Sequence, residues 1–288
     1  MTSILPTRTP MKCWNGLWTC TVLAAGVLMT VPAAAQEPET PLELAPAETR
    51  WEGAIGLSAG YRPEYSGAAR QVGKLTPAVF LRYGRFTITN ASGFVTRRAD
   101  DVVRGLGVDF VNDARLRVNL ALRFDAGRSE GTSASLAGLG DIKPTVRARL
   151  NLGWRFDGPW RLGGSWSVDA LGRGGGNFGD ISGGLEHRVS PGTVLTAGLA
   201  LSAAGDRYMQ TYYGISAEQA ARTGYAAYEP HAGLRDLAIS SGFRTDLGPD
   251  WILIGGGSAT RLLGPAARSP LTTSRTGWGL NLGLARRF

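Results

Sequence analysis

Hydrophobic and polar residues alternate along much of this chain with a period of two. Between positions 116 and 124, apolar residues occupy every even position, while arginine, asparagine and alanine lie between them. Successive side chains of a β-strand point to opposite faces, so this pattern predicts a strand with one apolar and one polar face. The same alternation recurs at 51–61, 146–156, 160–168, 195–201, 237–243 and 277–288.

Five further segments are strand-like but less regular. They are 75–83, 85–95, 104–111, 177–189 and 250–262. The sequence therefore predicts twelve strands, an even number as bacterial membrane barrels have. The expected fold is all-β, a transmembrane antiparallel β-barrel of about 12 strands.

The connections between these segments alternate in length. Short turns rich in Gly, Pro, Asn and Asp occur at 83–84, 112–113, 157–159, 190–192 and 248–250. Longer connections fall at 62–71, 97–103, 128–141, 172–176, 205–231 and 264–274. Outer-membrane barrels have short periplasmic turns and long outer loops, so the alternation supports that topology.

The last segment carries its apolar residues on one face and ends the chain on an aromatic residue. A closed barrel leaves no exposed edge, because its last strand pairs with its first. We therefore expect this segment to be the closing strand and the assembly signal read by the barrel assembly machinery. The residues of this C-terminal assembly signal are Trp278, Leu280, Leu282, Leu284 and Phe288.

The first 50 residues have a different composition. A basic Lys12, an apolar run and small residues up to Ala35 predict a signal peptide over 1–35, with translation starting at Met1 or Met11. Residues 36–50 contain three prolines and four glutamates and are expected to be a disordered periplasmic lead-in. The barrel then spans 51–288, and the expected location is the cell outer membrane. Both cysteines lie within 1–35, so no disulfide is expected afterwards.

The polar face of the strands would line the barrel interior. Its charges form a predicted lumen ladder of Arg117, Arg123, Asp125, Arg147, Arg149, Asp169, Asp180 and Glu186. One interpretation is a structural interior cross-linked by Arg–carboxylate pairs. The other is a pathway for anions. The structural interpretation is favoured, because charge is normal in such lumens.

The longest connection, 205–231, is rich in tyrosine. Its candidate residues for outer-loop recognition or for plugging the barrel mouth are Arg207, Tyr208, Tyr212 and Tyr213. Tyrosine is favoured at recognition surfaces, and an inward-folded loop explains the same residues equally well. Ser216 is predicted to cap a short helix that runs to Arg222.

Candidate chemistry is sparse. His187 and His231 are the two histidines; neither has a nucleophile in a recognisable context, so a barrel hydrolase is a minor alternative. Paired histidine spacing for a metal is also missing, and no catalytic, metal or cofactor residues are assigned. The formal charge of +8 suits an anionic neighbour. The predicted signal peptide and the alternating placement of the arginines argue against nucleic acid and favour lipopolysaccharide and outer-membrane lipid.

Five motifs stand out along the chain: YRPEYSG at 61–67, GLGDI at 138–142, DRYMQTYYGIS at 206–216, GLRD at 233–236 and RLLG at 261–264. Together they resemble the MipA/OmpV family, whose namesake is the MltA-interacting protein. The resemblance covers nearly all of 51–288, and 208–214 is its most specific part. Ala137 and the segment 265–268 depart from the family pattern, so loop recognition is expected to differ from the namesake.

The resemblance implies an outer-membrane barrel without catalytic residues. For the namesake it implies a scaffold that holds a lytic murein transglycosylase near a murein synthase, and thus a link to peptidoglycan turnover. Other relatives are called porins, adhesins or antigens. Two function classes therefore stay open: a scaffold or interaction protein, and a channel for small, anionic solutes.

Overall fold

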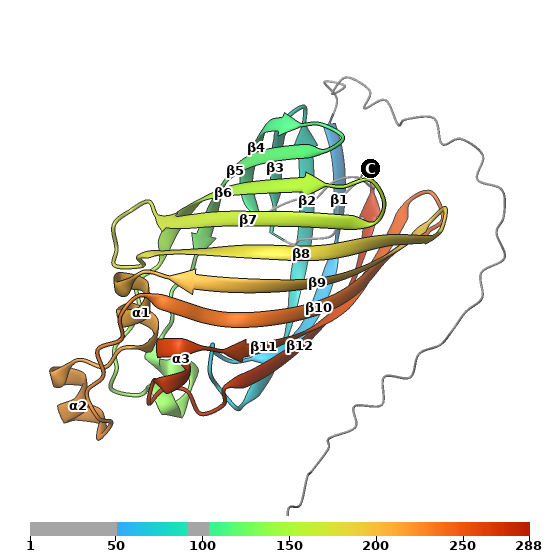
Figure 1. Cartoon of the computed structure of the whole chain (residues 1–288). Coiled ribbons are helices and arrows are strands. Elements are labelled where there is room, and N and C mark those ends of the chain that lie inside the picture. Colours follow the sequence, from blue (N-terminus) through green and yellow to red (C-terminus); the bar gives the residue numbers. More distant parts are fainter. Residues whose placement is uncertain (1–50, 91–103) are drawn as a thin grey trace, which may run out of the picture. The chain divides into compact units, whose positions relative to one another are not determined.

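The computed structural model describes residues 51–90 and 104–288. These residues form twelve antiparallel strands in one closed barrel, which confirms the predicted fold (Figure 1). The strands are β1 Trp51–Pro63, β2 Gln71–Tyr83, β3 Phe86–Thr89, β4 Gly105–Asn112, β5 Leu116–Asp125, β6 Thr145–Arg155, β7 Trp160–Asp169, β8 Asn177–Ser190, β9 Thr193–Ala204, β10 Gly233–Leu247, β11 Trp251–Leu262 and β12 Thr276–Arg287.

Each strand pairs with its neighbours in sequence, and β12 returns to pair with β1. The turns at the end that carries the C-terminus are two to four residues long, and the long connections that the structure describes lie at the other end (Figure 1). The predicted alternation of short turns and long loops is therefore confirmed. Within the described ranges, no helix is both long and apolar enough to cross a bilayer.

The barrel closes through the last residue of the chain. The backbone N–H of Phe288 donates to Gly53 O at 3.0 Å, and Gly53 N–H donates to Phe288 O at 3.2 Å. A β-carbon at position 53 would lie 2.3 Å from the Phe288 ring, so the missing side chain of Gly53 leaves room for the ring. Leu284 then lies opposite Leu57, which continues the apolar outer face from β12 to β1.

The outer wall of the barrel is apolar. Leu120, Ile181, Ile239 and Leu282 are exposed there, as expected for side chains that face lipid. A one-residue slip of register would swap the two faces and place arginines in lipid, at about 2–4 kcal/mol each near the bilayer midplane.

The inner wall is not uniformly polar. Small and apolar side chains of β1, β2, β11 and β12 face inward and pack into a buried cluster of Ala54, Ala78, Phe80, Ile252, Ile254 and Ala285. The guanidinium of Arg82 lies 5.8 Å from the centre of the Phe80 ring and adjoins this cluster. The charged side chains of the ladder lie on the other wall, on β5 to β8. The strand pattern alone predicted charge on the inner face and did not predict this division.

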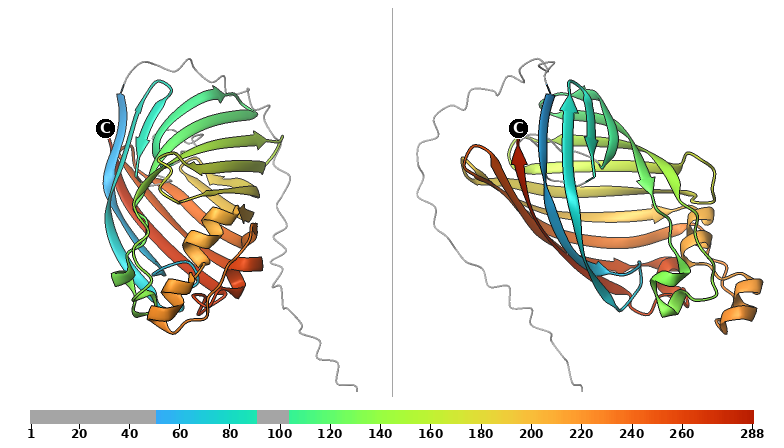
Figure 2. Two further views of the ribbon diagram at one scale, coloured as in Figure 1. Left: turned by 90° about the vertical axis from the view of Figure 1, so that its left-hand side faces the viewer. Right: turned by 180° about the vertical axis from the view of Figure 1, so that it is seen from behind.

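The long loops are folded rather than extended. Three helices, α1 Asp206–Tyr213, α2 Ala217–Thr223 and α3 Gly264–Arg268, lie at the end opposite the C-terminus (Figure 2). Four connections share one buried cluster, which we call the cap cluster. Its members are Tyr65, Ala68, Leu136, Leu139, Ile215 and Leu271. These four connections are therefore joined by a core of their own.

The local predictions are confirmed in part. The predicted short helix after Ser216 is confirmed as α2, and Ser216 and Gln219 form a reciprocal capping box at its start. Helices α1 and α3 were not predicted. In the less regular regions, β3 ends at Thr89 rather than at 95, and residues 91–103 lie outside the described part. The predicted signal peptide and lead-in, residues 1–50, also lie outside it.

Removing Phe288 should reduce barrel assembly, because the closing pair with Gly53 would lose both of its hydrogen bonds. We expect less folded, outer-membrane protein and more periplasmic degradation. The measurement is outer-membrane fractionation combined with the gel shift between heated and unheated samples. Phe288→Tyr keeps the ring and the backbone pair and serves as the control. Equal folded levels for the deletion and the wild type would contradict the assignment.

Candidate functional site: a luminal arginine and tyrosine network

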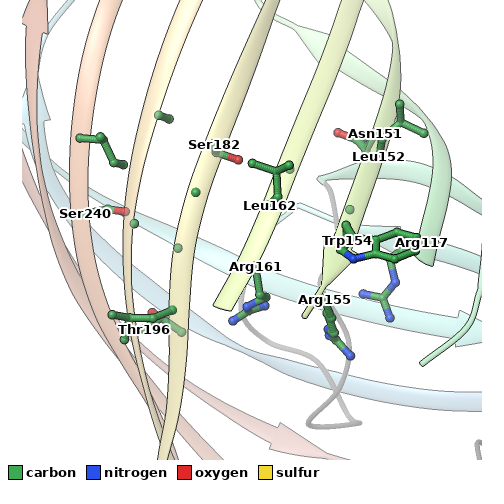
Figure 3. Close-up of a pocket in the computed structure, with 18 of the residues that line it drawn as sticks. Arg117, Asn151, Leu152, Trp154, Arg155, Arg161, Leu162, Ser182, Thr196 and Ser240 are labelled. Carbon is green, nitrogen blue, oxygen red and sulfur yellow. The ribbon is translucent and has the colours of Figure 1, made fainter. Parts of the chain in front are cut away.

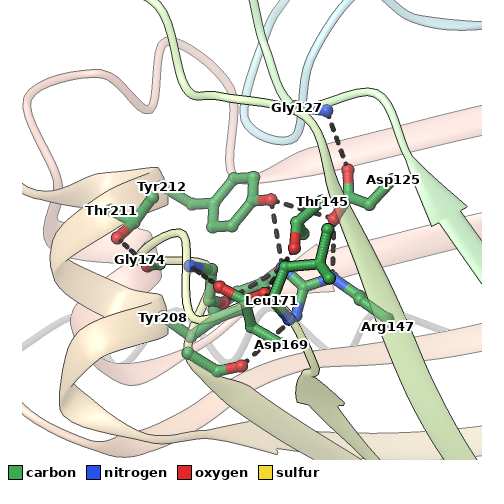
Figure 4. A network of polar contacts seen from close by, with 12 residues as sticks. Asp125, Gly127, Thr145, Arg147, Asp169, Leu171, Gly174, Tyr208, Thr211 and Tyr212 are labelled. Carbon is green, nitrogen blue, oxygen red and sulfur yellow. Dashed lines mark hydrogen bonds and ion pairs between the residues drawn. The ribbon is translucent and has the colours of Figure 1, made fainter.

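The described residues place one polar network where helix α1 meets the inner wall (Figure 4). The wall contributes Asp125 from the end of β5 and Arg147 from β6. The β7–β8 connection contributes the carbonyls of Gly175 and Gly176, and α1 contributes Tyr212. Segments distant in sequence meet here because α1 folds back over the barrel wall.

Arg147 is the centre of this network. Its Nε donates to Asp125 Oδ2 at 2.6 Å, and its Nη2 donates to Gly175 O at 3.0 Å and contacts Tyr212 Oη at 3.1 Å. Tyr212 in turn donates its hydroxyl to Asp125 Oδ2 at 3.1 Å. Arg147 is only 4% exposed, and a charge buried to that extent needs compensation. One carboxylate and the carbonyl and hydroxyl oxygens named above provide it.

An aromatic stack lies beside these polar groups. Tyr208 and Tyr212, one helical turn apart on α1, stack with ring centres 4.5 Å apart. Phe178 of β8 packs against Tyr208 at 5.1 Å. The guanidiniums of Arg147 and Arg235 lie 5.2 Å and 4.8 Å from the centre of the Phe178 ring. Both cations thus contact aromatic faces, an arrangement that is stronger when desolvated.

A second set of contacts fixes the position of α1. Thr211 Oγ1 donates to Gly174 O at 2.6 Å, and Arg128 Nη1 donates to Tyr212 O at 3.0 Å. Gly176 adopts φ = +60°, and a β-carbon there would lie 2.3 Å from the backbone nitrogen of Tyr208. Helix α1 is therefore seated directly on the glycine-rich β7–β8 connection.

Burial shapes the acidity of the α1 tyrosines. Burial, with a smaller contribution from the charge of Asp125, raises the pKa of Tyr212 to about 12. Burial also raises the pKa of Tyr213, which is 2% exposed and contacts Ser66 Oγ through its hydroxyl at 2.8 Å. Both phenols are therefore neutral hydrogen-bonding groups over the physiological range.

The residues of the predicted lumen ladder have different surroundings. Arg149 pairs with Asp180 at 2.8 Å, and Arg147 pairs with Asp125. Asp169 accepts from Thr145 Oγ1 and from the backbone of the β7–β8 connection. The structure brings Arg147 and Asp125 together with Tyr212 near the outer mouth, while Arg149 and Asp180 form a separate pair on the same wall.

The other predicted residues lie elsewhere. Glu186 pairs with Arg161 on the inner wall, and Arg117 donates to Asn112 Oδ1 at 2.7 Å. Arg123 faces inward, directly opposite Arg147. Arg207 is exposed on α1 and lies outside the network.

Two members of the network were missed from the sequence. Phe178 alternates with Asp180 along β8, so strand periodicity could have placed its ring inside. Arg235 lies within the noted GLRD motif, but a bulge between Leu234 and Asp236 changes the alternation. It pairs with Asp236 and donates to Tyr208 Oη at 3.3 Å.

A cavity of about 370 Å³ lies farther along the lumen, toward the short turns (Figure 3). Asn151, Ser182, Thr196 and Ser240 contribute amide and hydroxyl groups to its lining, and the guanidiniums of Arg117, Arg155 and Arg161 gather at its end. Apolar side chains, among them Leu152, Trp154 and Leu162, make up most of the remaining lining.

Residues 51–90 and 104–288 show no site that could hold a metal ion. Among the described residues, no cluster of three His, Asp or Glu side chains has a suitable arrangement. His231 Nδ1 lies 4.0 Å from Asp206 Oδ1, and both side chains are exposed. That pair lies at the rejoining of the longest loop, away from the network.

The closed barrel, its apolar outer wall and its charged interior define an outer-membrane β-barrel. The chain belongs to the MipA family, described as MltA-interacting protein MipA, which matches residues 55–288. This confirms the family indicated by the sequence motifs. A comparison with curated protein sequences gave no match.

Solved outer-membrane barrels are similar at low identity. The NanC porin is 10% identical, with a TM-score of 0.40 over 81% of this chain and 98% of that one. An outer-membrane channel from Pseudomonas putida F1 is 12% identical, with a TM-score of 0.40 over 83% and 95%. The DcaP channel of Acinetobacter baumannii is 11% identical, with a TM-score of 0.36 over 83% and 96%.

Gly176→Ala should displace α1, whereas Gly172→Ala should not. Both glycines have similar positive φ values, +60° and +65°, so both substitutions cost about 1–2 kcal/mol in backbone strain. Only the methyl group at 176 meets the backbone of Tyr208; the site at 172 is open. We expect faster amide hydrogen exchange over residues 206–213 in Gly176→Ala alone. The same exchange in both variants would contradict the seating of α1 on this connection.

The packing of Tyr212 should weaken at high pH. The pKa of its phenol is about 12 when packed and near 10 when released, so the stabilisation is complete below pH 10 and is lost as the pH rises toward 12. Tyrosinate absorbance of the wild type minus that of Tyr212→Phe should therefore titrate near pH 12. A difference titrating near pH 10 would show that Tyr212 is not packed.

Proposed function

We propose that this chain is a non-enzymatic scaffold of the outer membrane that binds enzymes of peptidoglycan synthesis and turnover. Its membership of the MipA family, with the description MltA-interacting protein, carries this proposal. The proposed partners are a lytic murein transglycosylase and a murein synthase. Barrel assembly machinery and lipopolysaccharide are further proposed partners, through the C-terminal strand and the outer loops.

The seating of α1 favours a scaffold function rather than that of a wide, open pore. The helix is held to the inner wall by the Arg147–Asp125–Tyr212 contacts and by the buried Met209 and Tyr213. A helix fixed in this way narrows the outer mouth. The apolar inner cluster around Phe80 further reduces the free interior.

The periplasmic end offers little area for a partner. Its turns are two to four residues long, whereas a standard interface needs about 800 Å² per partner. A periplasmic complex would therefore be weak, or would recruit the acidic lead-in of residues 36–50. Such a segment can order on binding at an entropic cost.

Enzymatic activity receives no support from the histidines. His231 and Asp206 have highly exposed side chains, at 92% and 75%, and their atoms lie 4.0 Å apart, too far for the hydrogen bond that would orient a general base. His187 is exposed at the opposite end of the barrel. We therefore propose no hydrolase role.

A channel for small anionic solutes is the second candidate. The observation that favours it is the group of three arginines, Arg117, Arg155 and Arg161, at one end of the cavity. Steady conductance of the purified protein in planar bilayers would favour this candidate over the scaffold.

Murein hydrolases and synthases should co-purify with the protein, and less so after deletion of residues 36–50. The physical reason is the small area of the short turns, which leaves the lead-in as the larger contact. The measurement is a pull-down from solubilised envelopes, with a scrambled 36–50 segment of equal composition as the control. If neither the full-length protein nor the deletion variant co-purifies with these enzymes, and the purified protein shows large ohmic conductance, the scaffold proposal is rejected and the channel is favoured.

A further inference from the structure

The lumen has a further cavity, of about 300 Å³, at the outer ends of β1, β11 and β12. Strand β12 lies six places from β6 in the ring of strands, so this cavity is across the barrel from Arg147. A β-carbon at Gly279 of β12 would lie 3.6 Å from both Arg62 Cβ and Ser258 Oγ, so the three strands meet at one surface. Arg62 has the same strand parity as the inward-facing Ala54, which places this surface inside the barrel.

Glu64 is the most unusual residue of the cavity lining. Its backbone N–H donates to Arg70 O at 3.1 Å, so the β1–β2 pairing continues one residue beyond Pro63 and keeps Glu64 on the inner face. The Glu64 side chain is only 4% exposed. Within the described ranges, Arg70 is the one cation near its carboxylate: Arg70 Nε lies 3.8 Å from Glu64 Oε2, and the Arg70 side chain is 76% exposed.

A carboxylate buried to this extent normally accepts hydrogen bonds. Asp125 accepts from Arg147 Nε, and Asp180 accepts from Arg149 Nη2, both within 2.8 Å. The distance of 3.8 Å from Arg70 is too long for such a bond, and no other described residue donates to the Glu64 carboxylate. The oxygens of Glu64 can therefore accept hydrogen bonds from a molecule in the cavity.

The other polar groups of the cavity complement Glu64. Ser258 and Thr260 of β11 line it, and their hydroxyls make no hydrogen bond to another residue of the described part. Arg62 lines it two residues before Glu64, roughly 7 Å away along the strand. Among residues 51–90 and 104–288, no carboxylate lies within 4.0 Å of the Arg62 guanidinium. One cavity thus offers an anion, a cation and two hydroxyls.

We propose that this cavity binds a small zwitterionic solute, with its ammonium group on Glu64 and its carboxylate on Arg62. An ammonium group has three donors, which match the Glu64 carboxylate and the hydroxyls of Ser258 and Thr260. A guanidinium binds a carboxylate in bidentate fashion. The site is independent of the scaffold function, because it lies at the outer end of the lumen. It also differs from an anion pathway, because its ligand has no net charge.

The test is calorimetric titration of the refolded, full-length protein in detergent with γ-aminobutyrate. Butylamine and butyrate have the same number of carbons and only one of the two charged groups. γ-Aminobutyrate should bind most tightly, because it alone contacts both Glu64 and Arg62. Glu64→Gln and Arg62→Gln should each weaken its Kd by about tenfold or more, as for loss of a charge-assisted hydrogen bond. The gel shift between heated and unheated samples checks that each variant is folded.

Arg70→Gln is the matched control for Glu64→Gln. It removes the cation closest to Glu64 and changes no residue that lines the cavity. Its Kd for γ-aminobutyrate should therefore equal that of the wild type or be tighter. If Glu64 served only as the ion-pair partner of Arg70, both variants would lower the Tm and leave the Kd unchanged, and that result would overturn the site.

Thermal unfolding gives an independent readout. Without ligand, Glu64→Gln should have a Tm equal to or above that of the wild type, because a buried charge without hydrogen-bond donors is destabilising. The rise in Tm that γ-aminobutyrate causes in the wild type should be lost in this variant. No saturable binding to the wild type, or equal Kd values for the wild type and Glu64→Gln, would overturn the site. Equal affinity for γ-aminobutyrate and for either singly charged probe would overturn the zwitterionic ligand.

Discussion

Barrel closure is the constraint on which the rest of this structure depends. A bilayer interior provides no water for unpaired N–H and C=O groups, so every strand must find two partners. The pairing of β12 with β1, completed by Phe288 and Gly53, removes the last free edges. Once the wall is closed, the period of two assigns each side chain to lipid or to the interior. The positions of the arginines, the tyrosines and the apolar inner cluster follow from that assignment.

The interior is divided rather than uniform. One inner wall is packed with Phe80, Ile252 and Ile254, and the other carries the arginines with their carboxylates. Helix α1 joins this second wall near the outer mouth, because Tyr208 and Tyr212 present aromatic faces and hydroxyls to Arg147 and Arg235. The same contacts hold the helix and compensate the buried cations. The position of α1 and the charge balance of the lumen are therefore coupled.

The sequence predicted the fold well because the strand signal is local. Alternation along β5 or β12 needs no knowledge of the neighbours, and short turns carry their own Gly and Pro. The ladder residues could also be placed inside from periodicity alone. Their partners could not, because Asp125 and Tyr212 meet only after a long loop folds back. Arg235 was missed since a bulge alters the alternation that the prediction used. The inner cluster was missed because β2 and β11 carry apolar residues on both faces around Phe80, Ile252 and Ile254, so neither strand shows a clear alternation.

The cap cluster has a consequence for how the surface of this protein can vary. Tyr65, Leu136, Ile215 and Leu271 come from four separate connections and share one buried core. A substitution that enlarges or empties this core in one loop changes the support of the other three. These four loops therefore form a single composite surface rather than a set of independent loops. An antibody or a bacteriophage would meet an epitope assembled from several loops, and peptides copied from one loop would reproduce it poorly.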